Sequence, residues 1–147
     1  MKIINLNRSV IAVSGEDAAV FLQGIISNDI NILNAEKALY TYLLTPQGKY
    51  LFDFFITKNN DEYLIDIAKE DASDFLKRIK IYKLRSKVQL EDKSEEYNVY
   101  SAPELSGEDN NFIWFKDSRA SNLGCRIILK ANHDLVGFEQ VDFTEYT

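Results

Sequence analysis

The feature that most constrains this chain is a tight turn, Thr45-Pro-Gln-Gly48, between two strand-like runs, Ala38–Leu44 and 49–57. Proline presets φ at the second position of a turn, and glycine adopts a left-handed position at little cost. Apolar residues occupy both faces of the second run, which predicts a strand covered on both sides. Asp53 interrupts that run, and a lone carboxylate is costly to bury unless it is paired. Asp53 is therefore either a strand-end residue in water or a residue with a partner, and the two apolar faces favour the second interpretation.

A second acid is expected near Asp53. A turn at 59–61 leads into a third strand, Glu62–Ala68, which carries Asp66 within an alternating apolar pattern. A short turn joins antiparallel neighbours, so we expect the two acids near each other on one sheet. Tyr40 lies in the first strand of the hairpin.

The best helical pattern spans residues 71–84, where apolar residues recur every three or four positions. Its second half and exit are basic. Six cations and no acid occur in eleven residues: Lys77, Arg78, Lys80, Lys83, Arg85 and Lys87. One interpretation is a solvated helix face with cations favourably placed near a helix C-terminus. The other is a local anion site for a carboxylate-tailed or phosphorylated ligand, or for an RNA backbone.

The rest of the pattern adds strands and a second helix. Residues 7–13 predict a strand, and Ser14-Gly-Glu-Asp17 predicts a capping box before a short helix that stops at Gly24. Later strands are expected at 88–90, 97–101, 112–115 and 125–130, and residues 136–147 predict the start of a helix. The fold class is therefore α+β, with mostly antiparallel sheets and two main helices.

Composition limits the classes of site. The chain has 147 residues, one Cys, one His and a net charge of −6. These counts exclude a disulfide framework and a zinc or iron–sulfur site built by this chain alone, so we expect no metal site. The acidic balance argues against direct DNA binding and against anionic membranes, and no run reaches transmembrane length. Because a strand pattern starts within a few residues, leaving no room for a signal or transit segment, we expect a cytoplasmic setting.

The lone Cys and the lone His carry no catalytic pattern. Cys125 lies in an apolar strand and is expected to be a small buried hydrophobe, with Arg126 on the opposite face. His133 lies in a polar stretch and is expected to face solvent.

Four segments together resemble a known family: residues 8–29, the turn and strand from Leu44 to Phe55, residues 63–87, and Asp117-Ser-Arg-Ala-Ser-Asn-Leu-Gly-Cys-Arg126. The last is similar to a D-P-R-x-x-x-L-G-x-R pattern, with Ser118 in place of Pro. Their order and spacing resemble the folate-binding YgfZ proteins and their mitochondrial iron–sulfur assembly counterparts. All of these are relatives of the aminomethyltransferase (T-protein) of the glycine cleavage system.

The resemblance implies a T-protein-like folate-binding domain, of which residues 1–147 are the N-terminal portion. The family's lysine-glycine-cysteine-tyrosine segment and its C-terminal β-barrel are missing from these residues and would lie beyond them. There is one further departure. Aminomethyltransferases carry two adjacent acids after the glycine turn, but here the first position is Phe52 and only Asp53 remains.

The resemblance also implies folate-binding residues. Asp53 matches the acid that contacts folate and assists aminomethyl transfer in the T-protein, Asp66 matches a folate-contacting Asn, and Tyr40 matches a ring-contacting Tyr. A pterin needs a carboxylate or amide for its edge, an aromatic ring for its face, and cations for its glutamate tail. In the basic stretch, Lys83 and Arg85 are candidates for those cations.

These features give one leading hypothesis and two alternatives. The resemblance implies a non-catalytic tetrahydrofolate-binding factor that supports iron–sulfur cluster assembly or repair, and thereby tRNA-modifying enzymes. Its partners would be folate and either iron–sulfur assembly proteins or their client enzymes. The first alternative is a folate-dependent aminomethyltransferase, in which Asp53 is catalytic. The second is an interaction domain that binds RNA or protein through the basic stretch.

Overall fold

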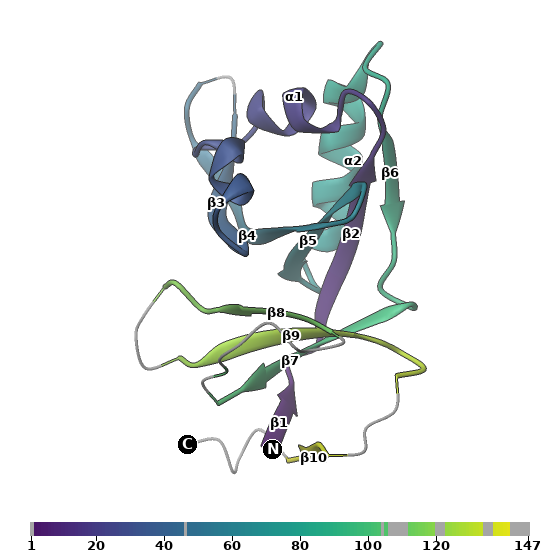
Figure 1. Ribbon diagram of the computed structural model, residues 1–147. Coiled ribbons are helices and arrows are strands. Elements are labelled where there is room, and N and C mark those ends of the chain that lie inside the picture. Colours follow the sequence, from purple (N-terminus) through teal and green to yellow (C-terminus); the bar gives the residue numbers. More distant parts are fainter. Residues whose placement is uncertain are drawn as a thin grey trace.

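Two five-stranded sheets form the part of the chain that the structure describes. The computed structural model describes residues 2–45, 47–103, 105, 112–119, 123–133 and 137–141. The first sheet has strand order β3-β4-β5-β2-β6 and the second β10-β1-β7-β9-β8. In Figure 1 the first sheet lies above the second, and both helices belong to the upper half. Every strand pair is antiparallel except β1 with β10, which confirms the expected α+β class with mostly antiparallel pairing.

The bounds of the elements are as follows. The strands of the first sheet are β2 (Arg8–Ser14), β3 (Ala38–Leu44), β4 (Tyr50–Asn59), β5 (Glu62–Ala68) and β6 (Gln89–Asp92). The strands of the second sheet are β1 (Lys2–Asn5), β7 (Tyr97–Ala102), β8 (Ile113–Lys116), β9 (Cys125–Lys130) and β10 (Glu139–Gln140). The helices are α1 (Ala18–Gln23), the short 3-10 helix η1 (Ile30–Asn34) and α2 (Ala72–Lys83).

The β3–β4 hairpin forms where the sequence predicts it, with one irregularity. Gly48 has φ of 81°, the left-handed conformation expected of a turn glycine. Pro46 lies outside the described residues. The register shifts between Leu43 and Leu44, so that Leu44 pairs with Tyr50 and skips Leu51. Because of this bulge, Tyr50 faces the same side as Leu44, whereas strict alternation along the strand would place it on the side of Phe52.

Helix α2 covers one face of the first sheet. Its buried stripe is Ala72, Phe75 and Ile79, as the apolar spacing predicts. The ring of Phe75 packs edge-on against Phe54 and Phe52, with centroids 5.0 and 5.8 Å apart. Successive strand residues point to opposite faces of a sheet. Asp53 and Phe55 therefore point away from α2.

The opposite face of the first sheet packs against the second sheet. Four of its strand residues meet four residues of the second sheet in one core. That inter-sheet core consists of Val10, Ala12, Phe55, Leu64, Tyr97, Val99, Phe115 and Ile128. The site described below lies along the margin of this core.

The chain passes from one sheet to the other at Asn7. Strand β1 ends at Asn5 in the second sheet, and β2 begins at Arg8 in the first. Asn7 adopts φ of 52°, a left-handed conformation that asparagine tolerates better than most residues. One left-handed residue therefore marks the change of sheet.

Two local expectations need correction. Helix α1 forms and ends before Gly24, but Ser14 is still paired in β2 and makes no cap. The carboxylate of Asp17 instead accepts a hydrogen bond from the backbone N–H of Lys87. His133 is half-buried rather than exposed, because its ring lies edge-on to Phe112 and Phe138.

The end of the described chain also differs from expectation. Residues 136–147 predict a helix start, but the structure has a short strand there, β10, which pairs in parallel with β1. Residues 142–147 lie outside the described residues. Within the described part of the chain, neither helix has the length and apolar character that crossing a bilayer requires.

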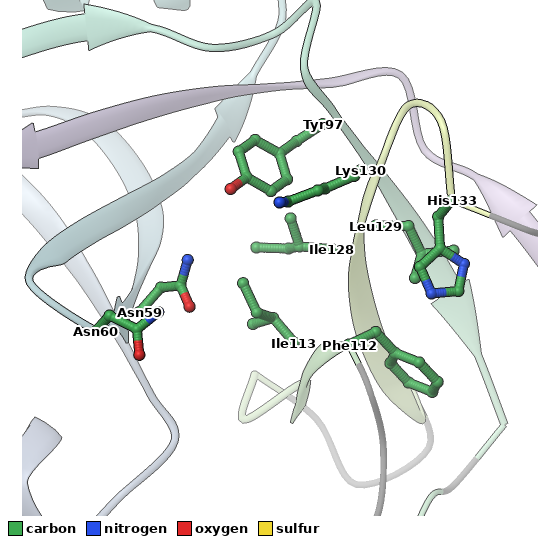
Figure 2. Close-up of a pocket in the computed structure, with 9 residues that line it drawn as sticks. All are labelled: Asn59, Asn60, Tyr97, Phe112, Ile113, Ile128, Leu129, Lys130 and His133. Atoms are coloured by element: carbon green, nitrogen blue, oxygen red, sulfur yellow. The ribbon is translucent and has the colours of Figure 1, made fainter.

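A pocket of about 480 Å³ opens where the β4–β5 turn meets the edge of the second sheet (Figure 2). Its described lining comes from both sheets and includes Asn59 of β4, Tyr97 of β7 and Lys130 of β9. Asp53 is at the other end of β4, six residues away, or about 20 Å along an extended strand.

Candidate functional site

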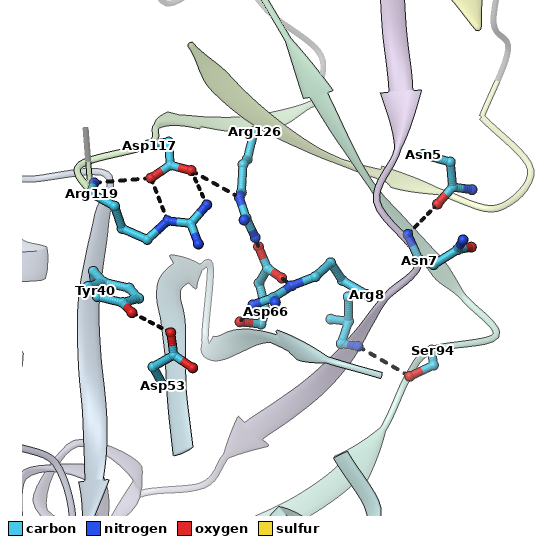
Figure 3. A network of polar contacts seen from close by, with 11 residues as sticks. Asn5, Asn7, Arg8, Tyr40, Asp53, Asp66, Ser94, Asp117, Arg119 and Arg126 are labelled. Carbon is cyan, nitrogen blue, oxygen red and sulfur yellow. Dashed lines mark hydrogen bonds and ion pairs between the residues drawn. The ribbon is translucent and has the colours of Figure 1, made fainter. Parts of the chain in front are cut away.

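Tyr40 and Asp53 form a polar pair on the face of the first sheet that points away from α2. Tyr40 lies on β3, and Asp53 lies opposite Tyr42 in the β3–β4 register. The Tyr40 hydroxyl donates a hydrogen bond to Asp53 Oδ2 (Figure 3). Burial raises the pKa of Tyr40 above its ordinary value, and the hydrogen bond and charge of Asp53 raise it further. Tyr40 is therefore a neutral donor at physiological pH.

An aromatic surface continues outward from this pair. The ring centroids of Tyr40 and Tyr42 are 5.6 Å apart, and those of Tyr42 and Tyr50 are 4.8 Å apart. Tyr42 is 36% exposed and Tyr50 is 67% exposed, so both rings are open to a ligand. We call Tyr40, Tyr42 and Tyr50 the tyrosine row. It lies beside the half-buried carboxylate of Asp53, whose second oxygen has no hydrogen bond to any described residue.

Asp66 is held in a different environment. It is 1% exposed and lies opposite Phe55 in the β4–β5 register, on the same face as Asp53 but not directly across from it. Its Oδ1 accepts a hydrogen bond from Arg8 Nε at 2.6 Å, and its Oδ2 accepts one from Arg126 Nη1 at 2.8 Å. Both carboxylate oxygens are thus occupied by guanidinium groups.

A second carboxylate extends this network toward the tyrosine row. Asp117 accepts hydrogen bonds from Arg119 Nε at 2.9 Å and from Arg119 Nη2 at 2.6 Å. Burial alone would raise the pKa of Asp117, but the hydrogen bonds and charges of Arg119 and Arg126 outweigh it and hold the pKa below its usual value. Arg126 Nε lies 3.5 Å from Asp117 Oδ2 and makes no hydrogen bond, so its contact there is an ion pair only.

The network carries a net positive charge and touches the Tyr40–Asp53 pair. Three guanidinium groups, those of Arg8, Arg119 and Arg126, face the two carboxylates of Asp66 and Asp117 (Figure 3). The Arg119 guanidinium lies 5.9 Å from the ring centre of Tyr40 and 5.4 Å from that of Phe55. Hydrogen bonds to Asp117 raise the pKa of Arg119, and the negative charges of Asp117 and Asp53 contribute as well.

The structure does not bring Lys83 and Arg85 to this site. Both follow the part of α2 that packs on the Phe52 and Phe54 side of β4, whereas Asp53 points to the other side. Most cations of the basic stretch are exposed, and Lys87 Nζ pairs with Glu16 at 3.2 Å. A solvated helix face accounts for this placement. The predicted folate residues thus fall into two groups on opposite faces of the sheet.

Sequence reasoning missed the arginines that organise the site. Arg8, Arg119 and Arg126 pair with acids that are distant in the sequence or within a turn, and no local spacing identifies such pairs. One signal was present, since Arg126 lies inside the apolar run Cys-Arg-Ile-Ile-Leu and a buried cation needs a partner. Arg126 does lie on the face opposite buried Cys125, as expected from strand alternation.

The described residues contain no cluster of three or more His, Cys, Asp or Glu side chains that could hold a metal ion. The site offers a carboxylate acceptor, aromatic faces and guanidinium cations, a combination suited to a flat polar ligand.

Comparison with known proteins decides the family. The family model of the GCVT N-terminal domain matches residues 7–102. The chain belongs to the GCVT N-terminal domain family. This assignment confirms the resemblance to the T-protein superfamily that the sequence motifs indicate.

Relatives of this GCVT-family chain include mitochondrial proteins named as iron–sulfur cluster assembly factor IBA57 homologs. The protein of Mycosarcoma maydis is 34% identical, over 96% of this chain and 40% of its own length. The protein of Neurospora crassa is 40% identical, over 57% of this chain and 21% of its own length. The chain thus spans less than half of the relatives it matches. Their names point to mitochondria, so the cytoplasmic expectation is wrong.

A solved structure confirms the fold. The glycine cleavage system aminomethyltransferase T from Bartonella henselae matches with a TM-score of 0.71 and 17% identity. The match covers 95% of this chain and 47% of the other. At this identity the match establishes the architecture, and the chemistry must be argued from the residues.

Proposed function

We propose that this GCVT-family chain is the N-terminal, tetrahydrofolate-binding portion of a mitochondrial-type iron–sulfur cluster assembly factor. Its family membership supports the folate ligand, and the names of the IBA57 homologs support the assembly role. By supporting cluster assembly or repair, the factor would sustain iron–sulfur enzymes, including those that modify tRNA. Its partners would be the cluster assembly proteins or the enzymes that receive the clusters.

The observation that carries the folate proposal is the open carboxylate oxygen of Asp53 beside the tyrosine row. A pterin presents adjacent N–H groups on one edge, which a carboxylate accepts well, and a flat ring that stacks on aromatic faces. Tyr40 fixes the other oxygen of Asp53, so that the acceptor is held in place before a ligand arrives. Tyr42 and Tyr50 supply exposed rings on the same face.

In this proposal the predicted residues take different roles. Tyr40 and Asp53 contact the ligand, whereas Asp66 acts through the network by fixing Arg8 and Arg126. Arg119 lies close enough to the Tyr40 ring to favour the glutamate tail or a ring oxygen on that side. Lys83 and Arg85 would reach such a ligand only from the opposite face of the sheet.

A binding role is favoured over aminomethyl transfer. The position of the first acid in the aminomethyltransferase pair is Phe52 here, and its ring packs against Phe75 of α2. The face that Asp53 shares with the tyrosine row therefore carries one carboxylate at this point of β4. Asp53 would orient the folate in this proposal, with no group transfer assigned to it.

A titration of tetrahydrofolate into the protein tests the ligand directly. Asp53→Asn should weaken binding by about tenfold or more, because a charge-assisted hydrogen bond to the pterin edge is lost. Asp61→Asn, an exposed acid in the β4–β5 turn, is the matched control and should leave the affinity unchanged. Absence of tetrahydrofolate binding would contradict the ligand. An unchanged affinity in Asp53→Asn would remove Asp53 from the site.

Two further assays test the role in iron–sulfur cluster assembly separately from tetrahydrofolate binding. Cells lacking the factor should recover the activity of their iron–sulfur enzymes when the protein is supplied, and should recover less with Asp53→Asn. Glycine cleavage activity with the lipoyl carrier protein should be absent. Robust glycine cleavage would instead identify an aminomethyltransferase.

A further inference from the structure

The pocket at the far end of β4 has features of a second binding site. It lies between the β4–β5 turn and the second sheet, and its volume of about 480 Å³ falls in the range of small-molecule pockets. The turn is shaped by Asn60, whose φ of 55° is left-handed. This shape brings Asn59 and Asn60 to the pocket wall.

The most informative residue there is Tyr97. Its side chain belongs to the inter-sheet core and the residue is only 7% exposed. Its hydroxyl makes no hydrogen bond to any described residue, and Figure 2 shows it directed into the pocket. The Tyr97 ring is held in the core, while its hydroxyl opens to solvent in the pocket, where it can donate to a ligand.

A cation points into the same space. Lys130, at the end of β9, lines the pocket and has no ion-pair partner among the described residues. In Figure 2 its ammonium group lies beside the Tyr97 hydroxyl, and the side-chain amide of Asn59 faces both across the pocket. These three groups converge as donors from β4, β7 and β9.

The acids near Tyr97 are held by a separate lysine. Burial raises the pKa of Tyr97 most, and the charges of Glu62 and Glu96 raise it further. Lys93 Nζ pairs with these two acids at 3.4 and 3.9 Å, and with Glu91 at 3.8 Å. None of the described lining residues is acidic, and Lys130 supplies the positive charge at the polar end of the pocket.

Apolar residues form much of the remaining wall. Ile113 of β8 and Ile128 of β9 lie beside the three donors, and Phe112 lines the pocket further along (Figure 2). We propose that this pocket binds a small organic carboxylate with an aromatic or branched apolar body. Lys130 pairs with the carboxylate, Tyr97 and Asn59 donate hydrogen bonds to it, and the apolar body packs on the two isoleucines. This site is separate from the Tyr40–Asp53 site.

Phenylacetate is a suitable probe, and phenylacetamide is its uncharged counterpart. Amide chemical shifts of the protein are followed as each compound is added. Phenylacetate should shift resonances of residues 59–60, 97 and 128–130 in a saturable way, and phenylacetamide should bind at least about tenfold more weakly. Lys130→Met should weaken phenylacetate binding by about tenfold or more. Tyr97→Phe, which removes only the hydroxyl, should weaken it by about fivefold or more.

The control variant is Lys80→Met, which removes an exposed cation of α2 and should leave phenylacetate binding unchanged. Asp53→Asn should also leave it unchanged, which separates this pocket from the tetrahydrofolate site. The proposal is overturned if phenylacetate produces no saturable shifts, if the acid and the amide bind equally, or if Lys130→Met binds like the parent protein.

Discussion

The hydroxyl of Tyr40 donates its hydrogen bond to Asp53 across the β3–β4 pair. The bond joins the residue that begins the tyrosine row to the half-buried acid of the hairpin. It also places a neutral donor and a charged acceptor next to Arg119, whose guanidinium is bound to Asp117. Each of these relationships predicts a measurable property.

The first concerns the ionisation of Tyr40. Its pKa is raised by burial, by the hydrogen bond to Asp53 and by the negative charge of Asp53, all of which oppose phenolate formation. Phenolate absorbance followed against pH should show a component that ionises above the ordinary value of about 10, to which Tyr40 and Tyr97 both contribute. Tyr40→Phe should remove the Tyr40 share of that component, and Asp53→Asn should lower the pKa of Tyr40. A Tyr40 that titrates with the exposed tyrosines would contradict the bond.

The second concerns acid stability. The folded-state pKa of Asp117 is depressed, so its stabilising contribution is present above the unfolded value of about 3.9 and is lost as pH falls through the folded value. Asp117→Asn should lower the free energy of unfolding by about 2 kcal/mol at pH 7, because Arg119 and Arg126 lose a charged acceptor. The two proteins should converge in stability at the acid end. Urea unfolding at a series of pH values measures this, and a difference that does not change with pH would argue against the ion pairs.

The third prediction compares the loss of stability when Asp66 or Asp53 is replaced by asparagine. Asp66→Asn leaves half-buried Arg8 without its carboxylate partner and leaves buried Arg126 with only its 3.5 Å ion pair to Asp117, and should cost about 3–5 kcal/mol. Asp53→Asn removes a charge from a half-buried site and retains an acceptor for Tyr40, so it should cost about 1 kcal/mol or less. Urea unfolding of both variants provides the comparison. Equal costs would mean that the Asp66 network does not distinguish the two positions.

The fourth prediction compares the effects of substituting two glycines. Gly15 has φ of 110°, and a Cβ there would meet the backbone oxygen of Lys87 at 2.3 Å. Gly48 has φ of 81°, and a Cβ there would meet nothing within 4 Å. Gly48→Ala should therefore cost only the left-handed conformation, about 1–2 kcal/mol. Gly15→Ala should cost clearly more, since the backbone of the α2–β6 connection must move. Thermal unfolding of the two variants would falsify this ranking if Gly48→Ala were the more damaging.

Local patterns in the sequence predict most of the elements. The strand limits of β3, β5 and β9 agree with the alternation of apolar residues, and the stripe of α2 is the one its spacing predicts. These signals are local, because period and turn chemistry act over a few residues. They also place Asp53 and Asp66 on neighbouring strands of one sheet, and the register shows that the two residues share a face.

Features that depend on contacts between distant segments were not predictable. The partners of Asp66 are 58 and 60 residues away. The bulge that turns Tyr50 toward Tyr42 cannot be recognised from the alternation of apolar residues either. The basic stretch illustrates the same limit. Its charge suggests a ligand tail, but the side of the sheet it occupies is decided by the packing of Phe75.

The change of sheet at Asn7 sets an order for folding. Every strand of the first sheet lies between Arg8 and Asp92, and all of its strand pairs can form once that part of the chain exists. Strand β1 is made earlier, yet its partners are Tyr100 and Ser101 of β7 and, later still, β10. Closing such a distant contact costs more chain entropy than closing a hairpin. On the ribosome, the first four-residue strand must therefore wait unpaired while the neighbouring sheet assembles, and the far edge of the second sheet is the last to close.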